Sequence, residues 1–209
     1  MAAMASGAHP PRSLGRVLLL GGALALAGIW AVLHAQRGDE ADPPESTLTW
    51  QARIAPAGEP GEPLVVSGQV FDPSGEKPAA GVVVYAYHTD AQGYYRRQGQ
   101  PGPGGRVPRL RGWARSDAQG RFQFRTIRPA PYPNGGIPAH IHFYLWGAGY
   151  PRQWTPELEF QGDRSVTAEA LAKSAALGRF ANIQPLVRGP DGAWHATINF
   201  RLLTVSNVR

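Results

Sequence analysis

The 209-residue sequence contains no cysteine, and charged residues make up only 17% of it. Disulfide bonds, thiolate nucleophiles and cysteine-ligated zinc or iron–sulfur sites are therefore excluded. The 21 Lys+Arg residues outnumber the 15 Asp+Glu residues, but the basic residues are scattered along the chain. A nucleic-acid-binding protein needs a basic face with interleaved aromatic side chains. We therefore expect no nucleic-acid partner.

One uncharged apolar run, "VLLLGGALALAGIWAVL", occupies residues 17–33. Arg12 and Arg16 precede it, and Ala35 in "LHAQ" offers a small residue for cleavage. This is the pattern of a signal peptide, and the run also just reaches the length that spans a bilayer. We predict that residues 1–36 form an apolar helix that acts as a signal peptide or a membrane anchor. The rest of the chain is then exported, to the periplasm or the cell exterior, or held at the membrane by this helix.

The following stretch has the composition of a linker. Residues 37–63 are acidic and rich in proline, as in "RGDEADPPES" and "APAGEPGEP", and segments of this kind act as tethers. Leu48, Trp50 and Ile54 alternate within it, which indicates some local order. A globular pattern begins after it, and we assign residues 64–209 to one domain.

Short apolar runs and frequent turns dominate this domain, in keeping with 26 Gly and 20 Pro in the chain. Seven or so runs, among them "LVVSGQVFD", "RFQFRTI" and "IPAHIHFYLWG", have the composition of strands bounded by turns. One short helix is expected at 166–177, with Ser165 or Thr167 as its N-cap. The pattern predicts a mainly β fold, namely an antiparallel β-sandwich with one short helix.

Two histidines share one face of a predicted strand in "PAHIHF". Side chains two residues apart in a strand point to the same side, so His140 and His142 project together while Ile141 and Phe143 face the other way. A single buried histidine is usually a hydrogen-bonded core residue. Two imidazoles on one face of an apolar strand are costly to bury unless each has a partner, and a shared metal ion would satisfy both.

Carboxylates, other histidines and tyrosines are the candidates to complete such a metal site. Glu157 and Glu159 lie on the next predicted strand, and His88 ends an earlier one. Tyr132 in "PAPYP" is flanked by prolines, which restrict the backbone on both sides of it. Rigid placement of a phenol suits a metal ligand, and it equally suits an ordinary core tyrosine.

Three motifs occur in order with short gaps: "DAQGYYRR", "RSDAQGRFQFRTIRPAPYP" and "PAHIHF". Together they resemble the intradiol ring-cleavage dioxygenases, the family of protocatechuate and catechol dioxygenases, over residues 64–202. The resemblance implies one non-haem Fe(III) held by Tyr95, Tyr132, His140 and His142. Phenolates are hard anionic donors that suit a trivalent ion.

The resemblance also implies a reaction. A small aromatic diol binds the iron, O2 is inserted between the two hydroxylated carbons, and a muconate-type diacid is formed. Tyr132 matches the ligand that the diol displaces and that accepts a proton, which makes it the expected catalytic residue. Tyr94 is adjacent to the expected ligand Tyr95 but would point to the opposite face of an extended segment.

The sequence departs from the family pattern around the metal site. The family usually has an arginine just before Pro-Ala-His, where Ile137 stands here, and Glu157 replaces a usual glutamine. Such an arginine would stabilise negative charge developing on the substrate. The arginines in and beside the "RRQGQPGPGGRVPRLR" loop could take over this role: Arg96, Arg97, Arg106, Arg109 and Arg111.

Two other hypotheses are open at this point. The strand and turn pattern also resembles transthyretin-like and carboxypeptidase-regulatory sandwiches, which are binding modules without iron. A third hypothesis keeps the iron but assigns it to binding or to other oxygen chemistry, because the family arginine is missing.

Overall fold

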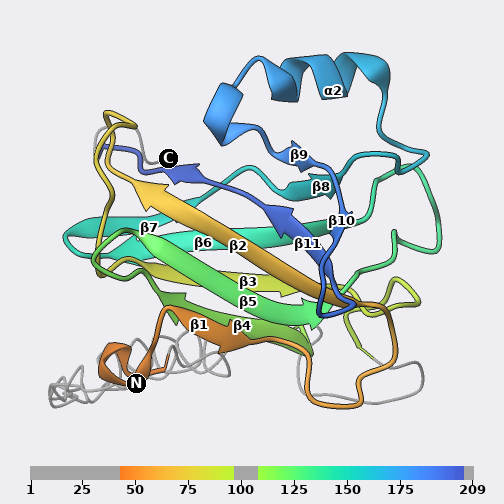
Figure 1. Cartoon of the computed structure of the whole chain (residues 1–209), viewed down its shortest axis with the longest axis horizontal. Coiled ribbons are helices and arrows are strands. Elements are labelled where there is room, and N and C mark those ends of the chain that lie inside the picture. The colour runs from red at the N-terminus through yellow and green to blue at the C-terminus, as the bar shows by residue number, and fades with distance from the viewer. Residues whose placement is uncertain (1–42, 97–107, 205–209) are drawn as a thin grey trace, which may run out of the picture. The chain divides into compact units, whose positions relative to one another are not determined.

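The computed structural model describes residues 43–96 and 108–204, in which two β-sheets pack face to face (Figure 1). The predicted signal peptide or anchor, residues 1–36, lies outside these residues. Across the described part of the chain, no helix combines the length and apolar character needed to cross a membrane.

The first sheet has six strands, and β2 is its longest. In the order β1-β5-β2-β11-β10, with β12 pairing the far part of β2, the strands are β1 (Gln51–Arg53), β5 (Arg121–Ile127), β2 (Pro63–Phe71), β11 (Trp194–Thr197), β10 (Val187–Arg188) and β12 (Phe200–Arg201).

The second sheet carries the histidine pair on its central strand β6. In the order β4-β3-β6-β8-β9, with β7 also pairing β6, the strands are β4 (Leu110–Arg115), β3 (Val83–His88), β6 (His140–Gly147), β8 (Leu158–Phe160), β9 (Ile183–Gln184) and β7 (Tyr150–Trp154). The strand β5 has the bounds expected from "RFQFRTI", whereas β7, β9 and β10 were not expected.

The prediction of an antiparallel sandwich is only partly right, because both sheets are mixed. The pairs β1–β5, β11–β2, β12–β2 and β8–β9 are parallel, while β2–β5, β3–β4 and β3–β6 are antiparallel. Parallel neighbours are joined by long connections, which let the chain return in the same direction. Side-chain alternation shows which face of a strand is buried, but it carries no information about strand direction.

Part of the predicted linker belongs to the first sheet. Strand β1 pairs with β5 through the register Gln51 to Gln123 and Arg53 to Arg125. Ile54, which follows the strand, is 6% exposed and lies in the hydrophobic core. A short 3-10 helix, η1 (Glu45–Thr47), precedes β1. The first sheet and the core therefore include residues well to the N-terminal side of residue 64.

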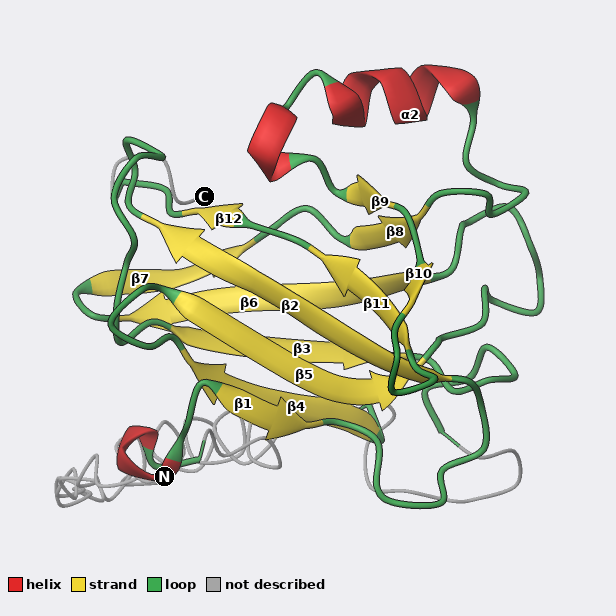
Figure 2. Ribbon diagram, viewed as in Figure 1, coloured by secondary structure: helices red, strands yellow, loops and turns green. Residues whose placement is uncertain are grey.

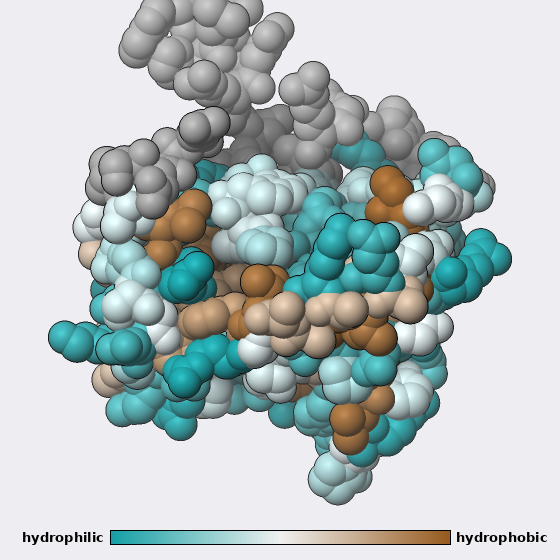
Figure 3. Space-filling model, turned by 90° about the horizontal axis from the view of Figure 1, so that it is seen from above, coloured by the Kyte–Doolittle hydropathy of each residue, from teal (hydrophilic) through white to brown (hydrophobic). Residues whose placement is uncertain are grey.

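The helix α2 (Ala168–Ala175) lies within the range expected for it. Thr167 is its N-cap, and its Oγ1 accepts a hydrogen bond from Ala170 N at 3.1 Å. The buried Ser174 Oγ accepts bonds from Asn182 N and Ile183 N at 3.0 and 2.9 Å, which fixes the helix to β9 (Figure 2). Hydrophobic and hydrophilic residues are interspersed over the surface seen from above (Figure 3).

The alternation along β6 determines where the histidines point. Ile141, Phe143 and Leu145 are at most 1% exposed and belong to the core between the sheets. His140 and His142 therefore project from the other face of the second sheet, as predicted. The core holds the strand in place, and the polar pair lies outside it.

Candidate functional site

The two histidines of β6 bring their ring nitrogens together. Their Nε2 atoms lie 3.0 Å apart, and the residues are only 5% and 8% exposed. Tyr87, directly opposite His142 in the pairing of β3 with β6, stacks on the His142 ring at 4.5 Å between centroids. Trp154 of β7 lies 5.2 Å from the same ring on centroids. Sequence reasoning missed both aromatic neighbours, since it did not give the strand register.

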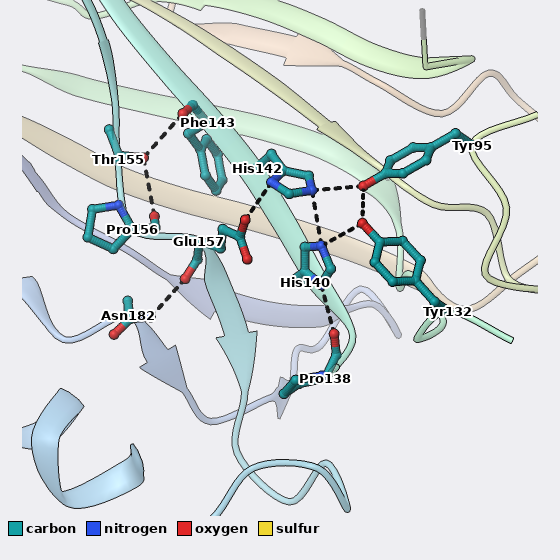
Figure 4. A network of polar contacts seen from close by, with 10 residues as sticks. All are labelled: Tyr95, Tyr132, Pro138, His140, His142, Phe143, Thr155, Pro156, Glu157 and Asn182. Carbon is teal, nitrogen blue, oxygen red and sulfur yellow. Dashed lines mark hydrogen bonds and ion pairs between the residues drawn. The ribbon is translucent and has the colours of Figure 1, made fainter. Parts of the chain in front are cut away.

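Two phenol oxygens lie beside the two imidazole nitrogens (Figure 4). Tyr95 Oη lies 2.6 Å from Tyr132 Oη and 2.7 Å from His142 Nε2. Tyr132 Oη lies 3.2 Å from His140 Nε2. The structure thus brings together the side chains of all four residues that the sequence singled out. Because β3 is the neighbour of β6, Tyr95 approaches from the loop beside the pair rather than from across the sandwich.

Close packing of two loops places the two tyrosines. Gly93 adopts φ +87°, and a Cβ there would lie 2.1 Å from Pro131 O, so only glycine lets the loops approach this closely. Thr89 Oγ1 donates to Ala130 O at 2.7 Å, and Ala130 N donates to Asp90 O at 3.1 Å. The segment that carries Tyr95 is therefore bonded to the segment just before Tyr132.

The contacts on the far side of each imidazole decide where its proton lies. His140 Nδ1 is 2.7 Å from Pro138 O, which can only accept, so Nδ1 carries the hydrogen. His142 Nδ1 is 2.7 Å from Glu157 Oε1, which also favours a hydrogen on Nδ1. That oxygen lies off the N–H axis, so the contact is a close charge contact rather than a linear hydrogen bond. Both Nε2 atoms consequently present lone pairs to one another.

The four converging atoms fit a single metal ion. Bonds of about 2 Å from one ion place neighbouring donors roughly 3 Å apart, and the four donor–donor contacts measure 2.6, 2.7, 3.0 and 3.2 Å. A metal ion would occupy the position toward which the two imidazole lone pairs point. Imidazole nitrogen with hard phenolate oxygen is a donor set that suits iron.

Burial shifts the pKa values of Tyr95 and His140 in the direction that favours their neutral forms. Burial and the hydrogen bond with Tyr132 raise the pKa of the Tyr95 phenol far above its usual value. Burial lowers the pKa of His140. Binding of a metal ion would displace the phenol protons, because a metal-bound phenol must be deprotonated to act as an anionic ligand.

Glu157 approaches the site from behind His142. The close contact with His142 lowers the pKa of the Glu157 carboxyl, so this group is ionised at neutral pH. His140, His142 and Glu157 have ligand atoms within 4.8 Å of one another. Two other residues that the sequence offered as metal ligands lie elsewhere. His88 is buried, and its Nε2 forms a 2.6 Å hydrogen bond with Thr126 Oγ1. Glu159 lies opposite His140 in the pairing of β8 with β6, and burial raises the pKa of its carboxyl.

Arg109 and Arg111, two of the described arginines in and beside the variable loop, form contacts away from the four donor residues. Arg109 forms a two-pronged ion pair with Glu59, with both N–O distances at 2.6 Å, and Arg111 donates to Pro108 O at 2.7 Å. Arg97 and Arg106 lie outside the described residues. Ile137, where the family arginine would stand, is 47% exposed.

A cavity of about 310 Å³ is lined by residues that include Trp154, Pro156 and Phe200. None of the four donor residues lines it, although Trp154 also lies beside the His142 ring.

Comparisons with known proteins agree with the arrangement. A family model described as dioxygenase matches residues 43–204. The chain is 36% identical over 114 residues to the protocatechuate 3,4-dioxygenase beta chain of Burkholderia cepacia, covering 51% of this chain and 48% of that one. It is 31% identical over 163 residues to 6-chlorohydroxyquinol 1,2-dioxygenase of Cupriavidus pinatubonensis, covering 69% and 55%. The chain thus spans about half the length of these curated relatives.

A solved structure is similar in fold. The dioxygenase domain of a dioxygenase–carbohydrate-binding protein fusion from Streptomyces sp. SirexAA-E superposes with a TM-score of 0.53 at 28% identity. The similarity covers 72% of this chain and 85% of that one.

The buried His88 predicts a pH dependence of stability. Burial lowers its pKa from 6.5 to about 4, so between these values the unfolded chain binds a proton that the folded chain does not. The stabilisation is complete above pH 6.5 and is lost as the pH falls toward 4, by at most about 3 kcal/mol. Denaturant unfolding of the metal-free protein across this range should show a shallower pH slope for His88→Gln than for the wild type. Equal pH slopes for the wild type and His88→Gln would contradict this prediction. His195→Gln, which changes an exposed histidine, is the control.

Proposed function

The chain belongs to the intradiol ring-cleavage dioxygenase family, and from this we propose that it uses O2 to cleave a catechol-type ring between its two hydroxylated carbons. The observation that carries the proposal is the convergence of Tyr95, Tyr132, His140 and His142 on one point. The relatives named above are all dioxygenases, which favours catalysis over a binding module without iron.

We propose Fe(III) as the cofactor, with Tyr95 Oη, Tyr132 Oη, His140 Nε2 and His142 Nε2 as its ligands. The bound ion would supply Lewis acidity toward the diol oxygens and redox chemistry toward O2. The pleat of β6 fixes the two imidazoles relative to one another. The tyrosines come from two loops, so the oxygen side of the site depends on the loop contacts at Gly93 and Thr89.

Tyr132 is the residue that we assign to proton transfer. The two phenols share a contact of 2.6 Å and differ in their contact to a histidine nitrogen, which is 3.2 Å for Tyr132 and 2.7 Å for Tyr95. Tyr132 is therefore the phenol that an incoming diol displaces at lower cost. Once displaced, its oxygen accepts a diol proton, which is general-base catalysis.

Aromatic side chains shape the approach to the donors. Tyr87 and Trp154 contact the His142 ring, and Trp154 remains 45% exposed. An aromatic substrate can stack on exposed aromatic faces. Ile137 presents an exposed apolar side chain instead of a cation, so the charge that develops on the ring is stabilised by the metal centre and not by an arginine at this position.

We further propose that the domain works outside the cytoplasm, with residues 1–36 as signal peptide or anchor. The support is the apolar run at 17–33 behind Arg12 and Arg16. Alkaline phosphatase fused after residue 63 should be active in a bacterial host, because that enzyme needs an oxidising compartment. The same fusion without residues 1–36 should be inactive. Activity that does not depend on these residues would contradict export.

The proposed function predicts a coloured iron protein. Purified protein should hold one iron per chain, show a visible tyrosinate-to-iron charge-transfer band, and consume O2 with a catechol. His142→Ala should abolish iron binding and colour, because it removes a ligand and leaves Tyr95 without its nitrogen partner. His195→Ala, at an exposed histidine paired with Asp191, should change neither. Wild-type protein without iron binding would overturn the proposal.

Tyr132→Phe separates metal binding from turnover. It should keep iron on the other three ligands but lower kcat about 10²- to 10⁴-fold, the usual contribution of a positioned proton acceptor. Tyr150→Phe removes a phenol oxygen from β7, away from the donor cluster, and should leave kcat unchanged. Full turnover by Tyr132→Phe would rule out its role as base.

A further inference from the structure

Glu157 contacts the metal site only through the ring of His142. Its Oε1 lies 2.7 Å from His142 Nδ1, while His142 Nε2 faces Tyr95 and His140 (Figure 4). The two nitrogens point to opposite sides of an imidazole ring. An ion bound at Nε2 is therefore out of reach of the carboxylate unless the ring turns over.

The position of Glu157 is fixed by the backbone around it. Asn182 Nδ2 donates to Glu157 O at 3.0 Å, and Asn182 O accepts from Glu159 N at 3.0 Å. Asn182 N in turn donates to Ser174 Oγ on α2. The helix and β9 thus support the strand that follows Glu157, which is the kind of outer support that orients a metal ligand.

The charge on Glu157 is directed at His142. No Lys or Arg among residues 43–96 and 108–204 forms an ion pair with this carboxylate. Its nearest titratable neighbours are His140, His142 and Glu159. The carboxyl is half-buried, so solvent screens its charge only in part. A carboxylate held 2.7 Å from Nδ1 favours positive charge on the ring and so makes the opposite nitrogen a stronger donor.

We propose that Glu157 is a positioning residue that, through His142, makes the centre hold ferric in preference to ferrous iron. The inference rests on the proposed function. Two phenolates and this carboxylate supply three negative charges, which neutralise Fe(III) without a further anion. With Fe(II) the same centre carries a net negative charge in a half-buried site, which is unfavourable. Glutamine, which the family usually has here, would orient the imidazole without adding this charge.

Glu157→Gln in the iron-loaded protein tests the inference by measurements other than turnover. Iron should still bind, with an affinity lower by about 10- to 100-fold, as is usual when a group behind a metal-bound histidine is lost. The Fe(III)/Fe(II) midpoint potential should move to more positive values. The charge-transfer band should move to longer wavelength, because a less electron-rich ferric ion accepts tyrosinate electrons more easily.

Glu159→Gln is the matched control, since it makes the same change two residues along, without the contact to an imidazole nitrogen. It should leave the band and the potential nearly unchanged. An unshifted potential in Glu157→Gln, or an equal shift in Glu159→Gln, would overturn the role of Glu157 while the proposed dioxygenase function stands. A wild-type protein that binds no iron would overturn both.

Glu157→Asp covers the case in which Glu157→Gln loses its iron entirely. It keeps the charge but withdraws it from Nδ1, so iron should bind with a potential between those expected for the wild type and the glutamine variant. Failure of Glu157→Asp to hold iron, with its fold intact by circular dichroism, would show that packing and not charge is the contribution of this residue.

Discussion

The arrangement of the site depends on two imidazole lone pairs that face one another across 3.0 Å. His140 and His142 cannot move apart without distorting β6, because Ile141, Phe143 and Leu145 hold that strand in the core. Their Nδ1 hydrogens are directed to Pro138 O and toward Glu157, so no imidazole proton lies between the two rings. The two nearby phenols can each donate one proton to the nitrogens, but a cation satisfies all four groups together.

The remaining features of the site follow from the fixed positions of the two imidazole nitrogens. The tyrosines must approach from loops, since both neighbouring strands are already paired with β6. The packing of Gly93 on Pro131 makes that approach short. Under the proposed function, two phenolates and one carboxylate behind His142, with no arginine at residue 137, would make the metal site strongly anionic. Such a site would favour a trivalent metal ion over a divalent one.

Much of this could be predicted from the sequence, because side-chain periodicity is a local property. Alternation gave the shared face of His140 and His142 and the bounds of β5, and helix-capping chemistry gave Thr167 as an N-cap candidate. Motif order linked Tyr95 and Tyr132 to the histidines. Strand direction, the pairing of β1 with β5, and the stacking of Tyr87 and Trp154 on His142 depend on contacts between distant segments. Local patterns do not encode such contacts, and for the same reason the sequence does not show that Arg109 pairs with Glu59.

The most direct test of the central claim is anomalous X-ray diffraction from crystals of the iron-loaded protein at the iron absorption edge. One iron peak should lie about 2 Å from Tyr95 Oη, Tyr132 Oη, His140 Nε2 and His142 Nε2, with the Glu157 carboxylate beside His142 Nδ1 and not on the metal. An iron bound by Glu157 with the two histidines, and without either tyrosine, would contradict the account.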